Sequence, residues 1–181
     1  MKNILPRTNT NQHERDKEKI KQEIIIIAAM SENRVIGKDN AMPWSVKGNL
    51  AHFKEMTMGF PCIMGRKTWE SLPKKPLSGR LNIIVSKTLA ANSYPDNQDI
   101  KVFPSLDLAV EYCADYEKVF ICGGESIYKQ ALPLANKIDL TLITGQYDGD
   151  TYFPEIDNSW IKKETVDHKE FSVITYVKEK I

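Results

Sequence analysis

Short apolar runs, separated by polar loops and by segments with helical spacing, organise the chain from residue 24 onward. Each run is too short to cross a membrane, and such runs are typical of strands buried on both faces of a parallel sheet. The predicted strands of this kind are residues 24–29, 61–64, 81–85, 100–103, 118–122 and 137–144. Residues 160–166 and 171–178 instead alternate well enough to predict a closing antiparallel hairpin.

Helical spacing follows several of these runs. Asn49, Leu50, Phe53 and Met56 recur at the spacing of one helix face, and Ser105 is a suitable N-cap for a later helix. Strands that alternate with helices and end in a hairpin predict an α/β fold. Its sheet should be mostly parallel, with an antiparallel edge formed by the C-terminal strands.

The first strand, the loop after it and the first helix form the most informative stretch. Residues 31–40 are a polar loop, and a loop of this length between packed elements is usually a lid or disordered. The apolar anchor Met42-Pro43-Trp44 favours a lid. Asn49 and Phe53 share a helix face directed toward the carboxyl end of the first strand, where open α/β sheets bind ligands.

Cations gather where the second strand meets its helix. Gly65 opens this helix, and Arg66 and Lys67 occupy its first turn. A helix N-terminus has unpaired N–H groups and a positive potential, so it suits a phosphate. Lys87, at the end of the next strand, would complete a basic pocket. The alternative is that all three cations are solvated surface residues.

Two glycines, Gly123 and Gly124, close another strand before a helix. Such a pair lets the backbone approach a ligand closely, although by itself it is also a common turn. It is not the G-x-G-x-x-G dinucleotide fingerprint, because Glu125 follows the pair and the last glycine is missing.

Composition and charge exclude several classes of function. The chain has 181 residues, enough for one domain with a sizeable core, and its net charge of +1 argues against general affinity for nucleic acid or membranes. The three cysteines, Cys62, Cys113 and Cys122, lie in or beside apolar runs and suggest free thiols in a reducing cytoplasm. No Cys/His spacing indicates a metal, and we expect the scattered histidines to be structural or solvated.

Residues 1–23 differ in composition from the rest of the chain. They are polar and densely charged, with almost no apolar periodicity, and no apolar segment suits a signal peptide. We therefore expect a flexible tail at residues 1–23 and a single folded domain at residues 24–181. A partner-binding tail is the alternative.

Four segments of this chain resemble the first strand, mobile loop and first helix of bacterial dihydrofolate reductase. They are Ile27-Ala28-Ala29, Arg34-Val35-Ile36-Gly37, Met42-Pro43-Trp44 and Leu50-Ala51-His52-Phe53-Lys54. Further similar segments follow in the family's order: residues 64–71, Gly123-Gly124 with Ile127-Tyr128, and Gly149-Asp150-Thr151 with Phe153-Pro154. The resemblance runs from residue 24 to the C-terminus. It implies a dihydrofolate-reductase-like α/β fold: an eight-stranded, mostly parallel sheet with an antiparallel C-terminal edge and helices on both faces.

The resemblance also implies which residues bind the cofactor. NADPH is favoured over NADH because Arg66, Lys67 and Lys87 suit its extra 2′-phosphate. The implied cofactor-binding residues are Ala29, Ile36, Gly37, Gly65, Arg66, Lys67, Thr68, Ser86, Lys87, Gly123, Gly124, Glu125, Ser126, Ile127, Tyr128 and Thr151.

The substrate implied by the family is a pterin with a glutamate tail. Arg80 would hold a tail carboxylate bidentately, and the Met42 loop would close over the nicotinamide. The implied substrate-binding residues are Ile27, Ala28, Asn49, Leu50, Phe53, Leu72, Leu77, Arg80, Cys122, Tyr128 and Thr141. The implied catalytic residues are Asn49, Met42, Trp44 and Thr141.

Asn49 departs from the family's pattern, which has an acidic residue five positions after the tryptophan. A carboxylate there would accept two hydrogen bonds from the pterin and favour its protonation, whereas an amide offers one acceptor and one donor. Losing a charge-assisted hydrogen bond costs roughly 1.5–3 kcal/mol. The nearest acid along the helix, Glu55, is six positions on, so we expect weakened activity and a rate that falls steadily as pH rises.

The predicted activity is NADPH-dependent reduction of 7,8-dihydrofolate to 5,6,7,8-tetrahydrofolate, in one-carbon metabolism, by a cytoplasmic monomer that binds neither metal, nucleic acid nor membrane. A hydride would pass from the nicotinamide to pterin C6, and solvent would supply the proton at N5. Two alternatives stay open. One is a pterin- or NADPH-binding protein with impaired catalysis. The other is a reductase of a different pterin or of a pyrimidine, as in riboflavin synthesis.

Overall fold

The computed structural model of the chain describes residues 22–46 and 48–179. The predicted tail therefore lies outside the described residues, except for its last two. Of these, Glu23 already belongs to the first strand, β1 (Glu23–Ser31).

Most predicted strands form, with ends that differ by a residue or two. The parallel ones after β1 are β3 (Cys62–Gly65), β4 (Asn82–Val85), β5 (Ile100–Phe103), β6 (Lys118–Ile121) and β7 (Lys137–Ile143). The C-terminal hairpin is β9 (Trp160–Asp167) and β10 (Phe171–Lys178). The helices are α1 (Asn49–Thr57), α2 (Arg66–Ser71), α3 (Leu106–Tyr112) and α4 (Glu125–Ala131).

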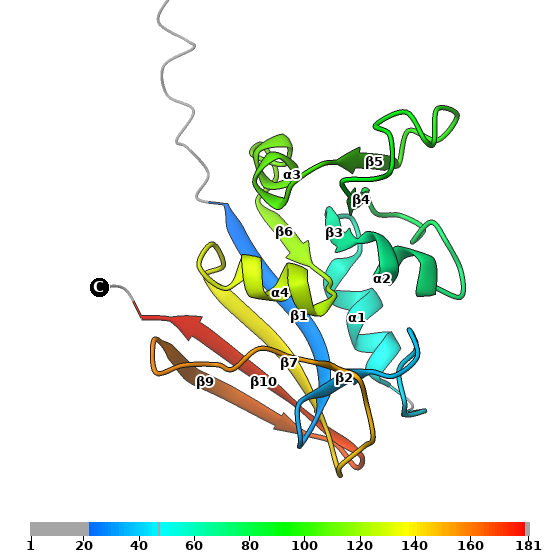
Figure 1. The fold of residues 1–181 in the computed structure, drawn as a ribbon. Coiled ribbons are helices and arrows are strands. Elements are labelled where there is room, and N and C mark those ends of the chain that lie inside the picture. Colours follow the sequence, from blue (N-terminus) through cyan, green and yellow to red (C-terminus); the bar gives the residue numbers. More distant parts are fainter. Residues whose placement is uncertain (1–21, 47, 180–181) are drawn as a thin grey trace, which may run out of the picture.

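Eight strands form one sheet in the order β5-β4-β3-β6-β1-β7-β10-β9 (Figure 1). The pairs among β5, β4, β3, β6, β1 and β7 are parallel, whereas β10 pairs antiparallel with both β7 and β9. The prediction of a mostly parallel sheet with an antiparallel C-terminal edge is therefore confirmed.

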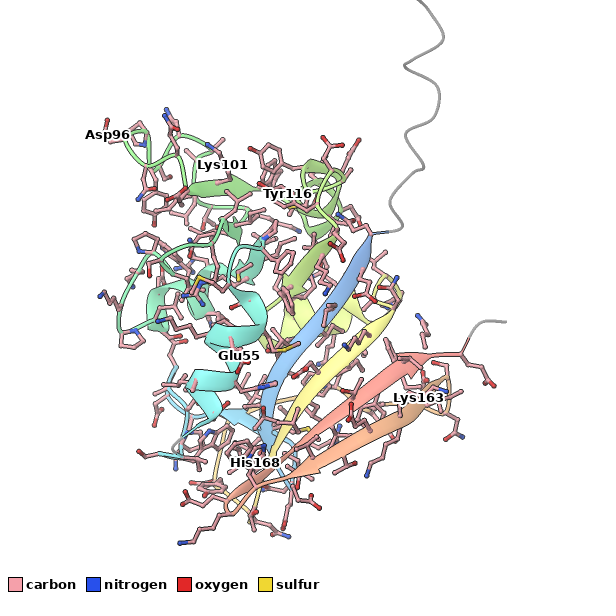
Figure 2. The ribbon with its side chains drawn as sticks, turned by 180° about the vertical axis from the view of Figure 1, so that it is seen from behind. Glu55, Asp96, Lys101, Tyr116, Lys163 and His168 are labelled. Carbon is pink, nitrogen blue, oxygen red and sulfur yellow. The ribbon has the colours of Figure 1, made fainter. Side chains whose placement is uncertain are left out.

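Helices cover both faces of the sheet. Successive residues of a strand point to opposite faces, and in the buried strand β1 the side chains on both faces are mostly apolar and need to be covered. Ile25 and Ile27 of β1 pack with Phe53 of α1, whereas Ile26 packs with the cluster that contains Ile127 of α4. Figure 1 shows α4 in front of the sheet, and Figure 2, seen from behind, shows α1. We call the side of the sheet that packs against α1 the α1 face, and the side that packs against α4 the α4 face.

Local signals explain where α3 begins. The side chain of Ser105 accepts a hydrogen bond of 3.3 Å from the backbone N–H of Leu108, so the predicted N-cap is confirmed. Leu106 and Ala109 are buried against the sheet, one helical turn apart.

A second, two-stranded sheet lies in the region predicted as a polar loop. It joins β2 (Val35–Gly37) to β8 (Thr151–Tyr152) in antiparallel pairing. Phe153, directly after β8, is fully buried against Tyr128, with ring centroids 5.0 Å apart. From the sequence, residues 149–154 are expected to form a turn with an aromatic plug, which Phe153 provides. The two short strands were not predicted, because three residues are too few to show alternation.

Among the helices of the described residues, none combines the length and the apolar character needed to cross a membrane.

Candidate active site

A cavity of about 690 Å³ opens at the carboxyl ends of β3 and β4 and beside the start of α4. Most of the residues predicted for the cofactor line it: Gly65, Arg66, Lys67, Thr68, Ser86, Lys87, Gly124, Glu125, Ser126, Ile127 and Thr151. Four further lining residues were not predicted from the sequence: Asn40, Val85, Thr88 and Asp150. Ala29, Ile36, Gly37, Gly123 and Tyr128 were predicted for the cofactor but do not line this cavity.

Two glycine turns meet beside the cavity. The N–H of Gly65 donates a hydrogen bond of 2.7 Å to the carbonyl oxygen of Gly123, which joins the ends of β3 and β6. Gly123 has a φ of 107°, and a Cβ atom there would lie 3.1 Å from the ring of Tyr128. Only glycine fits this conformation without strain. The glycine pair therefore keeps bare backbone next to the cavity.

Cations border the same cavity. Arg66 forms an ion pair of 2.6 Å with Glu70, one helical turn later in α2. Lys67 and Lys87 are exposed, and neither forms an ion pair within the described residues. Two cations are thus available to an anionic group in the cavity.

The residues after β2 are tied to β8 at the cavity margin. The N–H of Asp39 donates a hydrogen bond of 2.9 Å to Oδ2 of Asp150, and Lys38 forms an ion pair with Asp148. These contacts hold residues 38 and 39 of the loop against the segment that precedes β8. Met42, which follows, is 46% exposed, so the predicted lid carries an apolar side chain into solvent.

The α1 face of the sheet brings together a second group of predicted residues. In the pairing of β1 with β7, Ile27 lies opposite Asp139 and Ala29 lies opposite Thr141. Side chains two residues apart on a strand share a face, so Ile27, Asp139 and Thr141 all point toward α1. Asn49 is buried at the first position of this helix and is 6% exposed. The arrangement can form a flat, mostly apolar site with polar groups at one end.

Arg80 is buried close to this group. Its Nη1 donates a hydrogen bond of 3.0 Å to Oγ1 of Thr57, and its Nε donates one of 3.1 Å to the carbonyl oxygen of Ser78. Its guanidinium lies 5.8 Å from the ring centre of Phe53. Within the described residues it forms no ion pair with a carboxylate. A buried guanidinium of this kind suits a ligand carboxylate.

Trp44 lies under the loop rather than in solvent. It packs with Val35 and Phe171 and meets the ring of Tyr147 edge-on, with centroids 5.5 Å apart. Its Nε1 atom is buried and has no hydrogen-bond partner among the described residues. A buried donor without a partner is costly, so this N–H is suited to a ligand or a bridging water.

The other predicted substrate residues differ in their surroundings. Leu50 is 61% exposed on α1, whereas Leu72, Leu77 and Cys122 are partly buried around Trp69. Burial raises the pKa of the Cys122 thiol well above its ordinary value, so this cysteine stays a neutral, apolar side chain.

Two predicted residues face away from α1. The side chain of Ala28 points to the α4 face, so only its backbone is available to a ligand on the α1 face. The hydroxyl of Tyr128 donates a hydrogen bond of 2.9 Å to the carbonyl oxygen of Ile27, and burial raises the pKa of this phenol. Tyr128 therefore fixes the backbone of β1.

The structure also contains an ionisable pair that the sequence analysis missed. Nε2 of His52 lies 2.7 Å from Oδ1 of Asp139, and their side chains are 22% and 4% exposed. A hydrogen bond from the ring N–H of His52 to the carboxylate of Asp139 raises the pKa of His52 above its ordinary value. We had expected His52 to be structural or solvated. The signal that could have found the pair is a charged residue, Asp139, in the middle of a buried strand.

Within the described part of the chain, no three side chains of His, Cys, Asp or Glu lie close enough together to hold a metal ion.

Comparisons with known proteins match most of the chain. The family model described as dihydrofolate reductase matches residues 23–178. The chain is 45% identical to the dihydrofolate reductase of Neisseria gonorrhoeae over 150 residues, which cover 81% of this chain and 88% of that protein. It is 42% identical to dihydrofolate reductase type 3 of Salmonella typhimurium over 146 residues, 80% of this chain and 87% of that protein. It is 41% identical to the dihydrofolate reductase of Bacillus subtilis over 138 residues, 75% of this chain and 78% of that protein.

Proposed function

The chain belongs to the dihydrofolate reductase family, and we propose that it reduces 7,8-dihydrofolate to 5,6,7,8-tetrahydrofolate with NADPH. The observation that carries this proposal is the cavity of about 690 Å³, lined by residues of the family motifs and bordered by cations. The buried Arg80 on the α1 face supports the same substrate, since its guanidinium suits the carboxylate of a glutamate tail.

NADPH is the proposed cofactor because the cavity fits a phosphorylated dinucleotide. Arg66, Lys67 and Lys87 are three cations that line the cavity, and Ser86 lines it as well. The bare backbone around Gly124 leaves room for a close approach of the pyrophosphate. The bound nicotinamide would supply the hydride that goes to C6 of the pterin.

The protein's own residues would bind and orient the pterin. Ile27 and Phe53 offer apolar surface to the ring, and Asn49 and Thr141 offer polar groups at its edge. The exposed side chain of Met42 would close over the nicotinamide with the loop and exclude water. Solvent supplies the proton that N5 receives.

Asn49 limits how strongly this site can favour a protonated pterin. Its amide cannot accept two hydrogen bonds in the plane of the ring, and it carries no charge. We therefore propose an active reductase with a slower chemical step than an acidic residue at this position would give.

We further propose that the activity belongs to tetrahydrofolate biosynthesis in one-carbon metabolism, and that the protein acts as a monomer in the cytoplasm. The three cysteines are free thiols, two of them buried and Cys122 partly buried. Free thiols are usual in a reducing compartment. The net charge of +1 gives no basic excess that would attract nucleic acid.

A panel of oxidised ring substrates tests this function. Each substrate is mixed with NADPH, and the loss of reduced nicotinamide absorbance is followed. Dihydrofolate should be reduced, and NADH should support the reaction poorly. Reduction of a pyrimidine substrate but not of dihydrofolate would contradict the proposal. So would tight NADPH binding without turnover of any pterin.

A further inference from the structure

The His52–Asp139 pair lies on the same sheet face as the candidate pterin residues. Asp139 is directly opposite Ile27 in the pairing of β1 with β7, and it is two residues before Thr141 on β7. Positions two apart on a strand are roughly 6.5 Å apart. His52 is three residues after Asn49 on α1, so the two side chains are neighbours on the helix surface. The pair is therefore next to the position where the family's acidic residue is missing.

The pair also connects this buried region with the protein surface. His52 lines a second cavity, of about 340 Å³, between α1 and the turn that joins β9 to β10. Figure 2 shows this side of the molecule, with Glu55 on α1 and His168 in the turn. The carboxylate of Asp139 is almost fully buried, whereas the imidazole of His52 reaches the cavity. Solvent can therefore exchange protons with the imidazole.

The charges around the pair are few. On α1, the charge of Glu55 acts in the same direction as Asp139 and favours the imidazolium form of His52. From the turn, His168, Lys169 and Glu170 line the same cavity. On the strands, the cross-strand partners of Asp139 are Ile27 and Thr175, which carry no charge. Among the described residues of these elements, Asp139 is thus the one carboxylate on the α1 face that lies beside the candidate pterin residues.

We propose that the His52–Asp139 pair supplies the ionisable charge that Asn49 lacks, with Asp139 as the carboxylate that favours a protonated pterin and His52 as the group that neutralises it. The proposal rests on the proposed function. Both residues act on the pterin through their charge, from positions beside Asn49 and Thr141, and are positioning residues. In the reaction the pterin gains one hydride at C6 from the reduced nicotinamide and one proton at N5 from solvent.

The pair gives the pH dependence a definite shape. While His52 is protonated, the pair has no net charge. When His52 loses its proton, the negative charge of Asp139 is uncompensated and favours the proton on the pterin. This offsets the falling proton concentration, so the rate of hydride transfer should show a shoulder as pH rises through the pKa of His52. Without the pair the rate should fall steadily, as the sequence alone predicted.

Two variants separate this role from a structural one. A unit charge within roughly 10 Å, at an effective dielectric constant of about 20, shifts an equilibrium by about tenfold. Asp139→Asn should therefore lower single-turnover hydride transfer by about tenfold at pH values above the pKa of His52, where the carboxylate is uncompensated, and remove the shoulder. His52→Gln leaves the carboxylate uncompensated, so hydride transfer at acidic pH should be equal to or faster than that of the unmodified protein. A structural contact would make both variants slower together.

The experiment measures hydride transfer in single turnovers with NADPH and dihydrofolate between about pH 5 and 9, which extends above the ordinary range of histidine because the pKa of His52 is raised. Glu164→Gln is the matched control, since it removes one exposed carboxylate from β9, opposite Thr175. Nuclear magnetic resonance of the His52 ring gives a readout that is independent of activity. Its pKa should be raised in the unmodified protein and should fall in Asp139→Asn.

The outcomes distinguish the inference from the proposed function. If the unmodified protein reduces dihydrofolate but both variants slow equally with an unchanged pH profile, the inference is overturned and the function stands. If neither the unmodified protein nor Asn49→Asp reduces dihydrofolate, the function fails and the inference fails with it. Opposite effects of the two variants at acidic pH would support the inference. So would a smaller effect of Asp139→Asn when Asn49→Asp is also present.

Discussion

The guanidinium of Arg80 is held against the last turn of α1 by a hydrogen bond of 3.0 Å from its Nη1 to Oγ1 of Thr57. The contact orients a buried cation whose remaining donors can bind a ligand. Because Thr57 and Phe53 belong to the same helix, the position of the cation and the apolar surface of the candidate pterin site are set by one element.

Replacing Arg80 by lysine should weaken binding of the glutamate tail. Lysine keeps the charge but loses the planar fork that binds a carboxylate bidentately. A lost charge-assisted hydrogen bond is worth roughly 1.5–3 kcal/mol, so KM for dihydrofolate should rise about tenfold or more. A dihydropterin without a glutamate tail is the matched control, and its KM should not change. An equal rise for both substrates would mean that Arg80 supports the fold rather than the tail.

Restoring an acid at residue 49 should accelerate the reaction. Asn49→Asp adds a carboxylate that accepts two hydrogen bonds from the pterin and favours its protonation. kcat/KM for dihydrofolate at neutral pH should rise at least about tenfold, the low end of the value of a charge-assisted hydrogen bond. Steady-state kinetics at saturating NADPH measures this. Equal rates would show that residue 49 does not contact the pterin ring.

Lys87→Gln should reduce the preference for NADPH. The exposed cation lines the candidate cofactor cavity and has no described carboxylate partner. Its loss should weaken NADPH binding about tenfold and leave NADH binding unchanged, since NADH has no 2′-phosphate. Fluorescence titration gives both dissociation constants. Lys162→Gln, on exposed β9, is the control for the loss of one positive charge. If both dinucleotides weaken equally, the cation contacts another part of the cofactor.

The positions of the strands and of the candidate cofactor cavity were predictable because each depends on local signals. Mostly apolar runs of four to eight residues locate strands, and the glycines and cations at their carboxyl ends locate the cavity. The candidate site on the α1 face was less predictable. Its members come from α1 and β7, and only the register of β1 with β7 shows that Asp139 lies beside Ile27. Spacing along α1 showed only that Glu55 is six positions from Asn49, too far to replace the missing acid, and could not show Asp139.

The pairing of β2 with β8 was missed for a related reason. Val35 and Tyr152 are partners more than a hundred residues apart, and neither strand is long enough to show a period. What the sequence did show was the aromatic plug, because Phe153 is a large apolar residue in a polar turn. The burial of Phe153 holds β8 beside the core, where β8 pairs with β2.

Stability should depend on pH through His52. The hydrogen bond that His52 donates to Asp139 raises the folded-state pKa of His52 above its ordinary value of 6.5. A raised pKa stabilises the folded state fully below about pH 6.5 and loses this contribution as pH rises through the folded pKa. His52→Gln should therefore cost more stability at about pH 5.5 than at about pH 9. Urea unfolding at the two values measures the difference.

A double variant controls for effects outside the pair. Asp139→Asn removes the same interaction, so adding it to His52→Gln should change the pH-dependent part of the free energy of unfolding little. If the two losses add fully, the groups titrate independently and the hydrogen bond does not couple them.

Gly149→Ala should destabilise the protein and disturb the cofactor cavity. A Cβ at residue 149 would lie 2.3 Å from Cγ1 of Val35 and 2.8 Å from the carbonyl oxygen of Gly37. Val35 is fully buried, and its branched side chain has few alternative rotamers, so β2 must move away from β8. Overpacking of this kind costs about 1–3 kcal/mol, which urea unfolding detects.

Because Thr151 of β8 lines the candidate cofactor cavity, affinity for NADPH should fall in the same variant. Gly59→Ala is the matched control. A Cβ there meets nothing within 4 Å, but φ is 83°, so it carries the cost of a left-handed backbone without a steric clash. Gly59→Ala should be destabilised with normal NADPH binding. Full stability and normal NADPH binding in Gly149→Ala would show that β2 and β8 can separate at little cost. That result would contradict a rigid attachment of the loop to the cavity margin.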